Sequence, residues 1–403
     1  MTRNSSAPIA DVSDPGVPSR YDGCRSAPES AFRGALIDAL DGIDSNLVTF
    51  HDRFPTASSD DLVYPSTDNS KGWTSGFWTG QCWLAYEVTG DEQYRNAAQT
   101  QLETFDRRLE DGDMETHDLG FLYTLSAVAG YRLTGQFEYR ELAVAAAELL
   151  TDRYWDDLGL IQAWGPLDAS ASDEWVQGRM IADTMMNLPL LFWASETTDE
   201  RRYATIADAH ARTNVRHIVR DDASTAHTFK SDIESGAPLG VETHQGYADD
   251  SCWARGQAWQ LYGYAIAATY TGESAYAELA SKLANYYLER VEADHVPRWD
   301  FDAPADDGVR DSSAAAVAAC GLDELSRILP SADDRTRQYR TAALETLESL
   351  AENYTTDPDS SNGLLMEGSY HRTDDDFDEC CLWGDYFYVE GLVRATEQWE
   401  RYW

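Results

Sequence analysis

The sequence predicts an all-α fold, an (α/α)6 barrel in which six helical hairpins close into a toroid. Two kinds of helical segment alternate along the chain, one apolar on a single stripe and the other apolar on nearly every side. Six segments of each kind occur, and period-two strand patterns are scarce. A closed ring of hairpins forms one domain even at a length of 403 residues.

The outer helices of the ring are predicted from the amphipathic segments. These segments mix Arg, Asp and Glu with Leu, Ala and Ile at helical spacing, so one face can be buried while the other meets water. The predicted outer ranges are 30–52, 91–109, 136–152, 199–219, 273–292 and 333–354.

The inner helices are predicted from segments rich in aromatic and small residues, which suit burial on both faces. Small residues such as Gly76, Gly80, Gly120 and Ala314 to Ala316 would let neighbouring inner helices approach closely. The predicted inner ranges are 75–87, 119–133, 181–193, 253–270, 312–325 and 383–399.

Short strands and an N-terminal leader complete the predicted organisation. We expect β pieces only in loops, for instance around residues 158–161 or 227–229. Residues 1–28 are rich in Ser, Pro, Asp and Gly, so we expect a flexible leader or a loosely docked arm. Residues 29–403 then form a single (α/α)6 catalytic domain.

The charge balance is strongly acidic. The chain has 71 Asp and Glu against 31 Lys and Arg, which gives a net charge of −40, and only Lys71, Lys230 and Lys282 are lysines. This charge argues against a nucleic-acid partner, because such partners need a basic surface. It resembles the surfaces of proteins from salt-accumulating halophiles, where salt screens the self-repulsion. The alternative is an acidic mesophilic enzyme.

The cysteines and the N-terminus bear on the compartment. The six cysteines show no paired metal-ligand spacing, and the adjacent Cys380 and Cys381 are a poor disulfide pair, which predicts reduced core thiols. The N-terminus has no apolar signal-peptide core, and no run of 18 apolar residues occurs in the chain. We therefore expect a cytoplasmic protein that has no membrane partner.

Polar and aromatic residues stand at or just before the start of each inner helix, so a toroid brings them together at one end. Rings stack on sugar faces, and carboxylates bind hydroxyls or move protons, which together predicts a sugar site. The helix starts contribute Trp73, His117, Asp118, Asp183, Arg255, Asp311, Ser312, Trp383 and Asp385, and the loops add Trp164, His227, His244, Gln245, Trp299, Tyr370 and His371.

Asp183 and Asp118 are the candidates for catalytic residues, because each lies just before a predicted helix whose sequence is apolar. Burial of a lone carboxylate raises its pKa, which suits a proton donor near neutral pH. The alternative for either residue taken singly is a helix N-cap, in which the side chain accepts backbone N–H bonds. If both carboxylates lie in one cavity, we favour a role for the pair in general acid and base catalysis.

The motifs resemble those of the unsaturated glucuronyl hydrolases, family 88 of the glycoside hydrolases. Together they run in the family's order from about residue 30 to residue 403, and the set is specific although each motif alone is weak. The matching runs are 72–78 (GWTSGFW), 117–123 (HDLGFLY), 183–191 (DTMMNLPLL), 245–247 (QGY), 253–259 (WARGQAW), 311–315 (DSSAA) and 383–387 (WGDYF).

The resemblance implies an (α/α)6 barrel that removes a 4,5-unsaturated uronic acid from the non-reducing end of polysaccharide-lyase products. By matching motifs, Asp183 is the general acid and base that protonates the C4–C5 enol ether and helps water add at C5. Asp118 is the second essential carboxylate, which holds ring hydroxyls. The resemblance implies no metal or organic cofactor, and we expect a monomer or a weak homo-oligomer.

The same matching implies the substrate-binding residues. His227 and Gln245 match positions near the uronate and the reacting carbon, and His244 is a departure for which we expect no role. Residues 360–378 contain no lysine and only Arg372 as a basic residue, so we do not expect selective binding of a sulfated unit. The residues that match the sugar-contacting wall are His117, Trp73, Trp164, Arg255, Trp259, Tyr370 and His371.

Three alternatives stay open at this point. An unsaturated rhamnogalacturonyl hydrolase would keep the toroid and its carboxylates but act on pectin-derived disaccharides. A sugar epimerase or a non-catalytic sugar-binding toroid is more distant, since fold alone does not fix function.

The run of Asp374 to Asp376 is interpreted as a solvated acidic segment, because its spacing is unlike that of a calcium loop.

Overall fold

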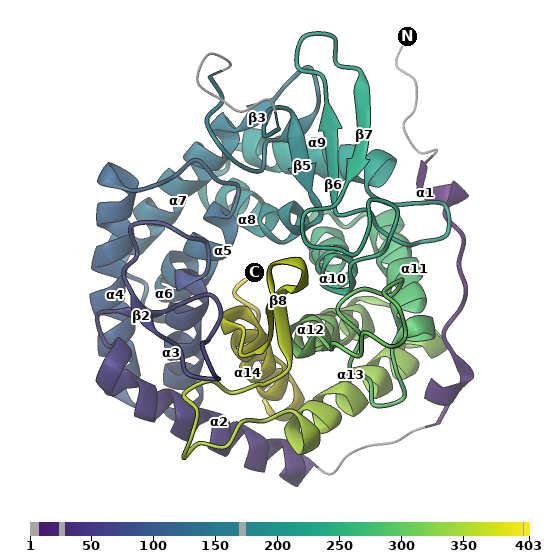
Figure 1. Ribbon diagram of the computed structural model, residues 1–403. Helices are drawn as coiled ribbons and strands as arrows, with labels where there is room; N and C mark the ends of the chain where they lie inside the picture. The colour runs from purple at the N-terminus through teal and green to yellow at the C-terminus, as the bar shows by residue number, and fades with distance from the viewer. Residues whose placement is uncertain (1–7, 24–28, 169–174, 398) are drawn as a thin grey trace.

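The helices form two concentric rings, as Figure 1 shows. The computed structural model describes residues 8–23, 29–168, 175–397 and 399–403. Within these residues the predicted alternation is confirmed, because each outer helix leads into an inner helix and the chain circles the ring once. The all-α barrel predicted from the sequence is therefore the observed fold.

The outer helices match their predicted ranges to within about two residues. Their amphipathic pattern explains the placement: α9, for example, buries Tyr203, Ala207, His210 and Ala211 on one face and exposes arginines on the other. The outer helices are α2 (Glu29–Phe50), α4 (Glu92–Asp111), α7 (Phe137–Asp152), α9 (Arg201–His217), α11 (Ser274–Arg290) and α13 (Asp334–Asn353).

The inner helices are buried along most of their length. The second of them is interrupted by a π-helical turn, η2 (Thr124–Val128). The inner helices are α3 (Ser75–Thr89), α5 (Leu119–Tyr123) with its continuation α6 (Ala129–Thr134), α8 (Leu188–Thr198), α10 (Ala254–Thr271), α12 (Ser312–Ile328) and α14 (Leu382–Thr396).

The predicted start of the third inner helix at Ile181 is wrong. Ile181 ends strand β5 (Arg179–Ile181), a 3-10 turn η3 (Ala182–Met186) follows, and the α-helix starts only at Leu188. The physical reason is Pro189, which has no N–H and would clash with a preceding helical carbonyl, so it fits only in the first turn of α8. Asp183 therefore lies on η3, ahead of the α-helix.

Close helix packing closes the ring. Neighbouring inner helices contact one another around the circle, and α14 packs against α3 to join the end of the chain to its beginning. Two of the predicted small residues sit at these contacts. A Cβ atom on Gly120 would overlap the backbone of Asn187, and one on Gly76 would overlap that of Phe121, so only glycine allows these approaches.

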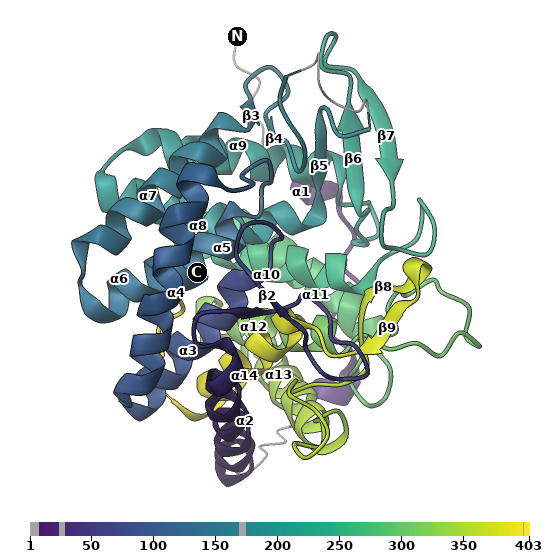
Figure 2. The same ribbon diagram turned by 60° about the vertical axis from the view of Figure 1, so that its left-hand side comes forward.

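Short strands lie in the loops on one side of the ring, as Figure 2 shows for β5 to β9. The predicted strands near 158–161 and 227–229 are confirmed by β4 (Leu160–Ile161) and β6 (Thr228–Ser231). β6 lies between β5 and β7 (Pro238–Glu242) in an antiparallel sheet. The remaining strands form antiparallel pairs: β1 (Phe54–Pro55) with β2 (Ser66–Thr67), β3 (Tyr154–Trp155) with β4, and β8 (Gly368–His371) with β9 (Asp376–Glu379), the last pair linked by η4 (Arg372–Asp374).

The N-terminal segment contains α1 (Pro8–Asp11) and η1 (Ser19–Tyr21). The amine of Lys282 on α11 donates hydrogen bonds to the carbonyls of Val12 at 2.7 Å and Ile9 at 3.2 Å. Arg20 donates to the carbonyl of Leu288 on the same helix at 2.6 Å. The flexibility of residues 1–28 and the single-domain organisation of residues 29–403 stay predictions.

The last residues of the chain enter the centre of the ring (Figure 1). The ring of Trp403 is fully buried and stacks on Phe387 with centroids 5.6 Å apart. Its indole N–H donates to Glu390 at 2.8 Å, and its carbonyl accepts from Tyr270. This packing fills the core beneath the inner aromatic residues.

Two further expectations concern thiols and the membrane. The five cysteines within the described residues are free and buried, as predicted, while Cys24 lies outside the described residues. No helix of the described part of the chain is both long enough and apolar enough to cross a membrane.

Candidate active site

A cavity of about 360 Å³ lies where the inner helices begin. The ring topology predicts this position, because the start of every inner helix and the strands between the hairpins face the same end. Eight of the eleven residues that the family resemblance assigns to the site line it. The lining residues are Trp73, His117, Asp118, Trp164, Ile181, Asp183, His244, Gln245, Tyr370, His371, Asp374 and Asp376.

Asp183 lies on η3 and is not a helix cap. Neither η3 nor α8 has a side-chain cap hydrogen bond, and Asp183 Oδ2 is buried with no hydrogen-bond partner among the described residues. Burial, with a smaller contribution from the charge of Asp118, raises the pKa of Asp183 to about 7, while Arg255 opposes the shift. A carboxyl group with this pKa can hold and release a proton near neutral pH.

Asp118 precedes α5 and also makes no cap hydrogen bond with its side chain. Instead, Thr116 Oγ1 donates to Asp118 Oδ2 at 2.6 Å. Burial raises the pKa of Asp118 to about 6, against the opposing effects of the Thr116 hydrogen bond and the charge of Arg108. The pKa values of both carboxyl groups are therefore raised, that of Asp183 more than that of Asp118, which suits one protonated and one ionised group.

His117 links the two carboxylate segments. Its Nδ1 lies 2.8 Å from Thr184 Oγ1, next to Asp183 in the chain, and its Nε2 lies 3.3 Å from Asp118 Oδ1. Burial, with a contribution from Arg153, lowers the pKa of His117 to about 3. The imidazole is thus neutral at physiological pH and fixes the side chains without adding charge.

Trp73 and Gln245 hold Tyr370 against the cavity. The indole N–H of Trp73 donates to the hydroxyl of Tyr370 at 3.0 Å, and the amide of Gln245 donates to the Tyr370 carbonyl at 2.8 Å. Next along the chain, His371 Nδ1 lies 2.8 Å from Asp374 Oδ2. One wall of the cavity therefore consists of rings fixed by hydrogen bonds.

Arg255, Trp259 and His227 are the three residues assigned by the resemblance that do not line the cavity, and Asp311, Ser312, Trp383, Asp385 and Trp299 from the helix starts and loops do not line it either. Arg255 is buried, pairs with Asp311 at 2.9 Å and donates to the Tyr370 carbonyl at 2.8 Å, so it supports the wall from behind. Trp259 lowers the pKa of Asp183 slightly, which places its N–H near that carboxyl group. Direct sugar contact by Arg255, Trp259 and His227 stays a prediction.

Several buried polar atoms around the carboxylates make no hydrogen bond to a described residue, although His117 Nε2 lies 3.3 Å from Asp118 Oδ1. Among the described residues, these include His117 Nε2, Asp183 Oδ2, His227 Nε2, Trp259 Nε1 and Gln260 Oε1. Unpaired buried polar atoms are costly, and native proteins keep them mainly where a ligand or water completes the hydrogen bonds. Their concentration here fits a ligand rich in hydroxyl groups.

The cavity lining also includes residues to which the motif match assigned no role. His244, for which we expected no role, lines the cavity. The ring centroids of His244 and His371 lie 5.0 Å apart. Asp374 and Asp376, interpreted as a solvated run, stand at the cavity edge. The matching run at residues 245–247 begins one residue after His244, and no local pattern indicates which loop residues fold back over the ring.

No metal site accompanies the carboxylates in the described part of the chain. No group of three or more His, Cys, Asp or Glu side chains is placed there to hold a metal ion. The chemistry available from these residues is proton transfer to and from Asp183, with Asp118 as a neighbouring charge.

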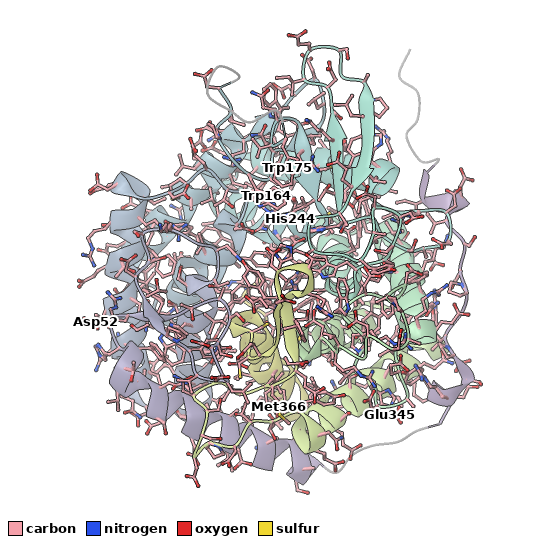
Figure 3. All side chains as sticks on the ribbon, in the orientation of Figure 1. Asp52, Trp164, Trp175, His244, Glu345 and Met366 are labelled. Carbon is pink, nitrogen blue, oxygen red and sulfur yellow. The ribbon has the colours of Figure 1, made fainter. Side chains whose placement is uncertain are left out.

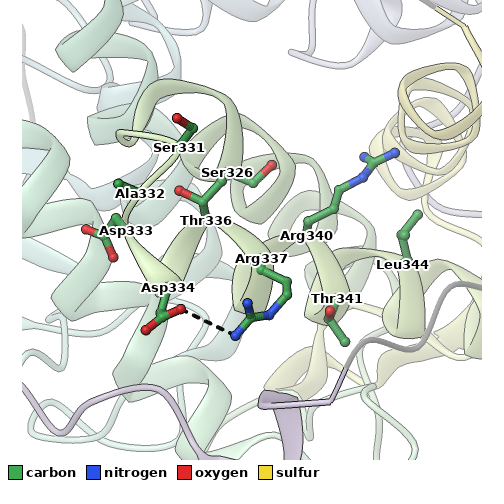
Figure 4. Close-up of a pocket in the computed structure, with 10 residues that line it drawn as sticks. All are labelled: Ser326, Ser331, Ala332, Asp333, Asp334, Thr336, Arg337, Arg340, Thr341 and Leu344. Atoms are coloured by element: carbon green, nitrogen blue, oxygen red, sulfur yellow. Dashed lines mark hydrogen bonds and ion pairs between the residues drawn. The ribbon is translucent and has the colours of Figure 1, made fainter.

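A cavity at the start of α13 offers a contrast (Figure 4). Its volume is about 390 Å³, but no aromatic ring lines it and its charged residues are engaged in ion pairs, as Arg337 is with Asp334 at 3.4 Å and Asp333 with Arg335 at 2.8 Å. Outer helices begin at the opposite end of the ring from inner helices. This cavity is therefore remote from the carboxylate pair.

Comparisons with known proteins give one consistent result. The model of Glycosyl Hydrolase Family 88 matches residues 47–401. The unsaturated glucuronyl hydrolase of Bacillus sp. (strain GL1) is 42% identical over 373 residues, which covers 92% of this chain and 98% of the relative. A crystal structure of the enzyme from Bacillus sp. GL1 has a TM-score of 0.87 and covers 90% of this chain and 96% of that one.

Two further similarities concern what the relatives act on or bind. The unsaturated chondroitin disaccharide hydrolase of Streptococcus pneumoniae is 40% identical over 376 residues, covering 92% of this chain and 93% of the relative. A variant unsaturated glucuronyl hydrolase solved with dGlcA-Glc-Rha-Glc is 42% identical, with a TM-score of 0.87 over 90% of this chain and 96% of that one.

Proposed function

Because the chain belongs to glycosyl hydrolase family 88 and is a glycosidase, we propose that it removes a 4,5-unsaturated glucuronyl residue from the non-reducing end of polysaccharide-lyase products. The observation that carries the proposal is the pair of buried carboxyl groups, Asp183 and Asp118, in one ring-lined cavity. The relatives that act on unsaturated uronyl sugars support the same substrate class.

In the proposed mechanism, Asp183 starts as the protonated acid. Its proton goes to C4 of the C4–C5 double bond, and the oxygen of a water molecule bonds to C5. The water then gives a proton to the Asp183 carboxylate, which restores the acid. The resulting hemiketal opens to a ketone at C5 and a hemiacetal at C1, and collapse of that hemiacetal to an aldehyde breaks the C1–O bond and releases the sugar as an alcohol. Asp118 stays ionised and accepts hydrogen bonds from ring hydroxyls.

Loss of the ultraviolet absorbance of the conjugated uronate tests this function. Unsaturated disaccharides from glycosaminoglycan, xanthan or ulvan lyases are mixed with the protein in high salt, and the absorbance is expected to fall. Unchanged absorbance with all of them would reject the hydrolase. Turnover of a pectin-derived disaccharide alone would instead show an unsaturated rhamnogalacturonyl hydrolase.

The pH dependence of kcat/KM follows from the two pKa values. Asp183 must be protonated, so the rate is expected to fall as the pH rises through about 7. Asp118 must be ionised, so the rate falls as the pH drops through about 6. Initial rates are expected to give a narrow, bell-shaped pH profile between these values. Because the two carboxyl groups interact, the apparent pKa values of this profile belong to the pair and not to either residue alone. A rate that rises steadily above pH 8 would contradict the role of Asp183.

The net charge of −40 supports the proposal that the enzyme is adapted to salt. Salt screens repulsion between surface carboxylates, so the melting temperature is expected to rise with KCl, and circular dichroism measures it. A melting temperature that falls as KCl increases would contradict salt adaptation.

The compartment and the oligomeric state are proposals of the same kind. The buried free thiols support a reducing, cytoplasmic location, which fractionation of the source cells tests. We also propose a monomer or a weak homo-oligomer, which sedimentation tests.

A further inference from the structure

Asn187 lies at the junction between the 3-10 turn that carries Asp183 and the helix that follows it. It comes directly after η3 and directly before α8. Its side chain is fully buried and does not line the active-site cavity. Figure 3 marks that cavity by two of its lining residues, Trp164 and His244, above the yellow β8–β9 hairpin. Any effect of Asn187 on a bound sugar therefore passes through other residues.

The Asn187 side chain caps a different helix from its own. An Asn in the N-cap position commonly accepts a hydrogen bond from the first turn of its own helix, but α8 has no side-chain cap. Instead, Asn187 Oδ1 accepts a hydrogen bond of 2.7 Å from the backbone N–H of Phe121, in the first turn of α5. The N–H groups of a first turn have no partner within their helix, so Asn187 supplies the missing cap.

Asp118 holds the N-cap position of α5, yet its carboxylate makes no cap hydrogen bond. The Phe121 N–H that this carboxylate would cap is already bonded to Asn187. The Asp118 carboxylate instead lines the cavity, where Thr116 donates to it at 2.6 Å. A carboxylate released from capping keeps its lone pairs for the hydroxyl groups of a sugar.

The amide nitrogen of Asn187 bridges the two carboxylate segments. It donates to the backbone carbonyl of Asp183 at 3.3 Å and also to the Asp118 carboxylate. Burial raises the pKa of Asp118, and the hydrogen bond from Asn187 is one of the effects that oppose this rise. An amide group has two N–H donors and one acceptor oxygen, so both donors and the oxygen of Asn187 are in use.

Gly120 allows this contact between helices. A Cβ atom on Gly120 would lie 2.6 Å from Asn187 Oδ1 and would overlap the Asn187 backbone. The two residues lie in two of the runs that resemble the family, 117–123 and 183–191, and the resemblance assigned a role to neither. The fold therefore brings the glycine of one run against the asparagine of the other.

We propose that Asn187 is a positioning residue, which caps α5 in place of Asp118 and so keeps the Asp118 carboxylate in the cavity at a fixed place relative to Asp183. The inference rests on the proposed function, because it needs these two carboxyl groups to act on the sugar. Without the Asn187 oxygen, the buried Phe121 N–H lacks a partner. The Asp118 carboxylate, at the N-cap position, then turns to that N–H group and leaves the cavity.

A double-mutant cycle between Asn187 and Asp118 tests the inference. Asn187→Ala is expected to lower kcat for an unsaturated glucuronyl disaccharide about thirtyfold, because the Asp118 carboxylate is displaced. In an Asp118→Asn background, the same substitution is expected to lower kcat less than about threefold, since the carboxylate it acts through is already absent. Two independent losses that multiply in the double variant would overturn the inference.

The crystal structure of Asn187→Leu tests the same inference without turnover. Leucine nearly keeps the side-chain volume, so the buried site stays filled, but it offers no acceptor to the Phe121 N–H. The Asp118 carboxylate is expected to be bonded to that N–H in the variant. A carboxylate that stays in its wild-type place would overturn the inference. If the wild type turns over no unsaturated disaccharide, the proposed function fails, and the structure of this variant still decides whether Asn187 holds Asp118.

Asn285→Ala is the matched control. Asn285 is also fully buried, its amide donates to the Asp14 carboxylate at 2.7 Å, and its oxygen accepts from the Tyr339 hydroxyl at 2.9 Å. It lies on the outer helix α11, away from the cavity lining. Its replacement should lower the melting temperature and leave kcat within about twofold in both backgrounds. A loss of kcat equal to that of Asn187→Ala would show general damage to the fold and would overturn the inference.

Discussion

Replacement of Asp183 by Asn is expected to reduce kcat by about a thousandfold while the fold and substrate binding persist. The amide has the shape of the carboxyl group but supplies no acidic proton to C4 and takes none from water. Because the raised pKa keeps a large share of the Asp183 carboxyl groups protonated near neutral pH, the replacement changes the charge of the buried site less than the loss of an ordinary carboxylate would. Ultraviolet absorbance measures turnover, and titration calorimetry measures binding of the unsaturated disaccharide.

Asp385→Asn provides a matched control for that variant. Burial also raises the pKa of Asp385 to about 7, but its oxygens accept hydrogen bonds from the backbone N–H groups of Leu364 and Leu365 and from the Tyr64 hydroxyl. Its replacement should lower stability and leave kcat per folded molecule within about threefold. Wild-type turnover in Asp183→Asn, or an equal loss in both variants, would refute the assignment of Asp183.

Asp118→Asn is expected to lose about a hundredfold or more in kcat and to bind the disaccharide more weakly. The variant removes a charge that accepts sugar hydroxyls. It also removes a negative charge that raises the pKa of Asp183. The decline of the residual activity at alkaline pH should therefore begin at a lower pH than in the wild type. Initial rates across pH and calorimetric binding measure the two effects separately.

Two outcomes would count against this role for Asp118. Binding as tight as in the wild type would show that the carboxylate does not hold the sugar. An alkaline limb that stays at the wild-type pH would show that Asp118 does not interact with Asp183. Because Thr116 donates to Asp118 in the wild type, the amide oxygen can keep that hydrogen bond and preserve the loop.

The sequence predicts the helices well because their periodicity is a local property. Ranges such as 274–290 and 312–328 agree with prediction to within a few residues, since amphipathic and fully apolar patterns report burial directly. The error at Ile181 arose because an apolar run suits a buried strand as well as a helix. Pro189 was the local signal against a helix extending back to Ile181.

The site was predictable only in part. Asp118 and Asp183 adjoin helix starts, so the ring topology alone brings them to one end. His244 lies in a loop whose position depends on contacts distant in sequence, such as that between Arg179 and Glu242. The periodicity of apolar residues does not predict such contacts, and the motif match did not extend to His244.

The scarcity of lysine has a practical side. The amine of Lys282 donates hydrogen bonds to the carbonyls of Val12 and Ile9, and the residue is 8% exposed. Lys71 is exposed two residues before Trp73, which lines the active-site cavity, and Lys230 is partly exposed on β6. Coupling to a solid support through these lysine side chains would therefore tether the molecule by the end that carries the active site, and the support would block the entry of oligosaccharides. Coupling through carboxylates, which are abundant in the chain, would leave that entrance open on most molecules.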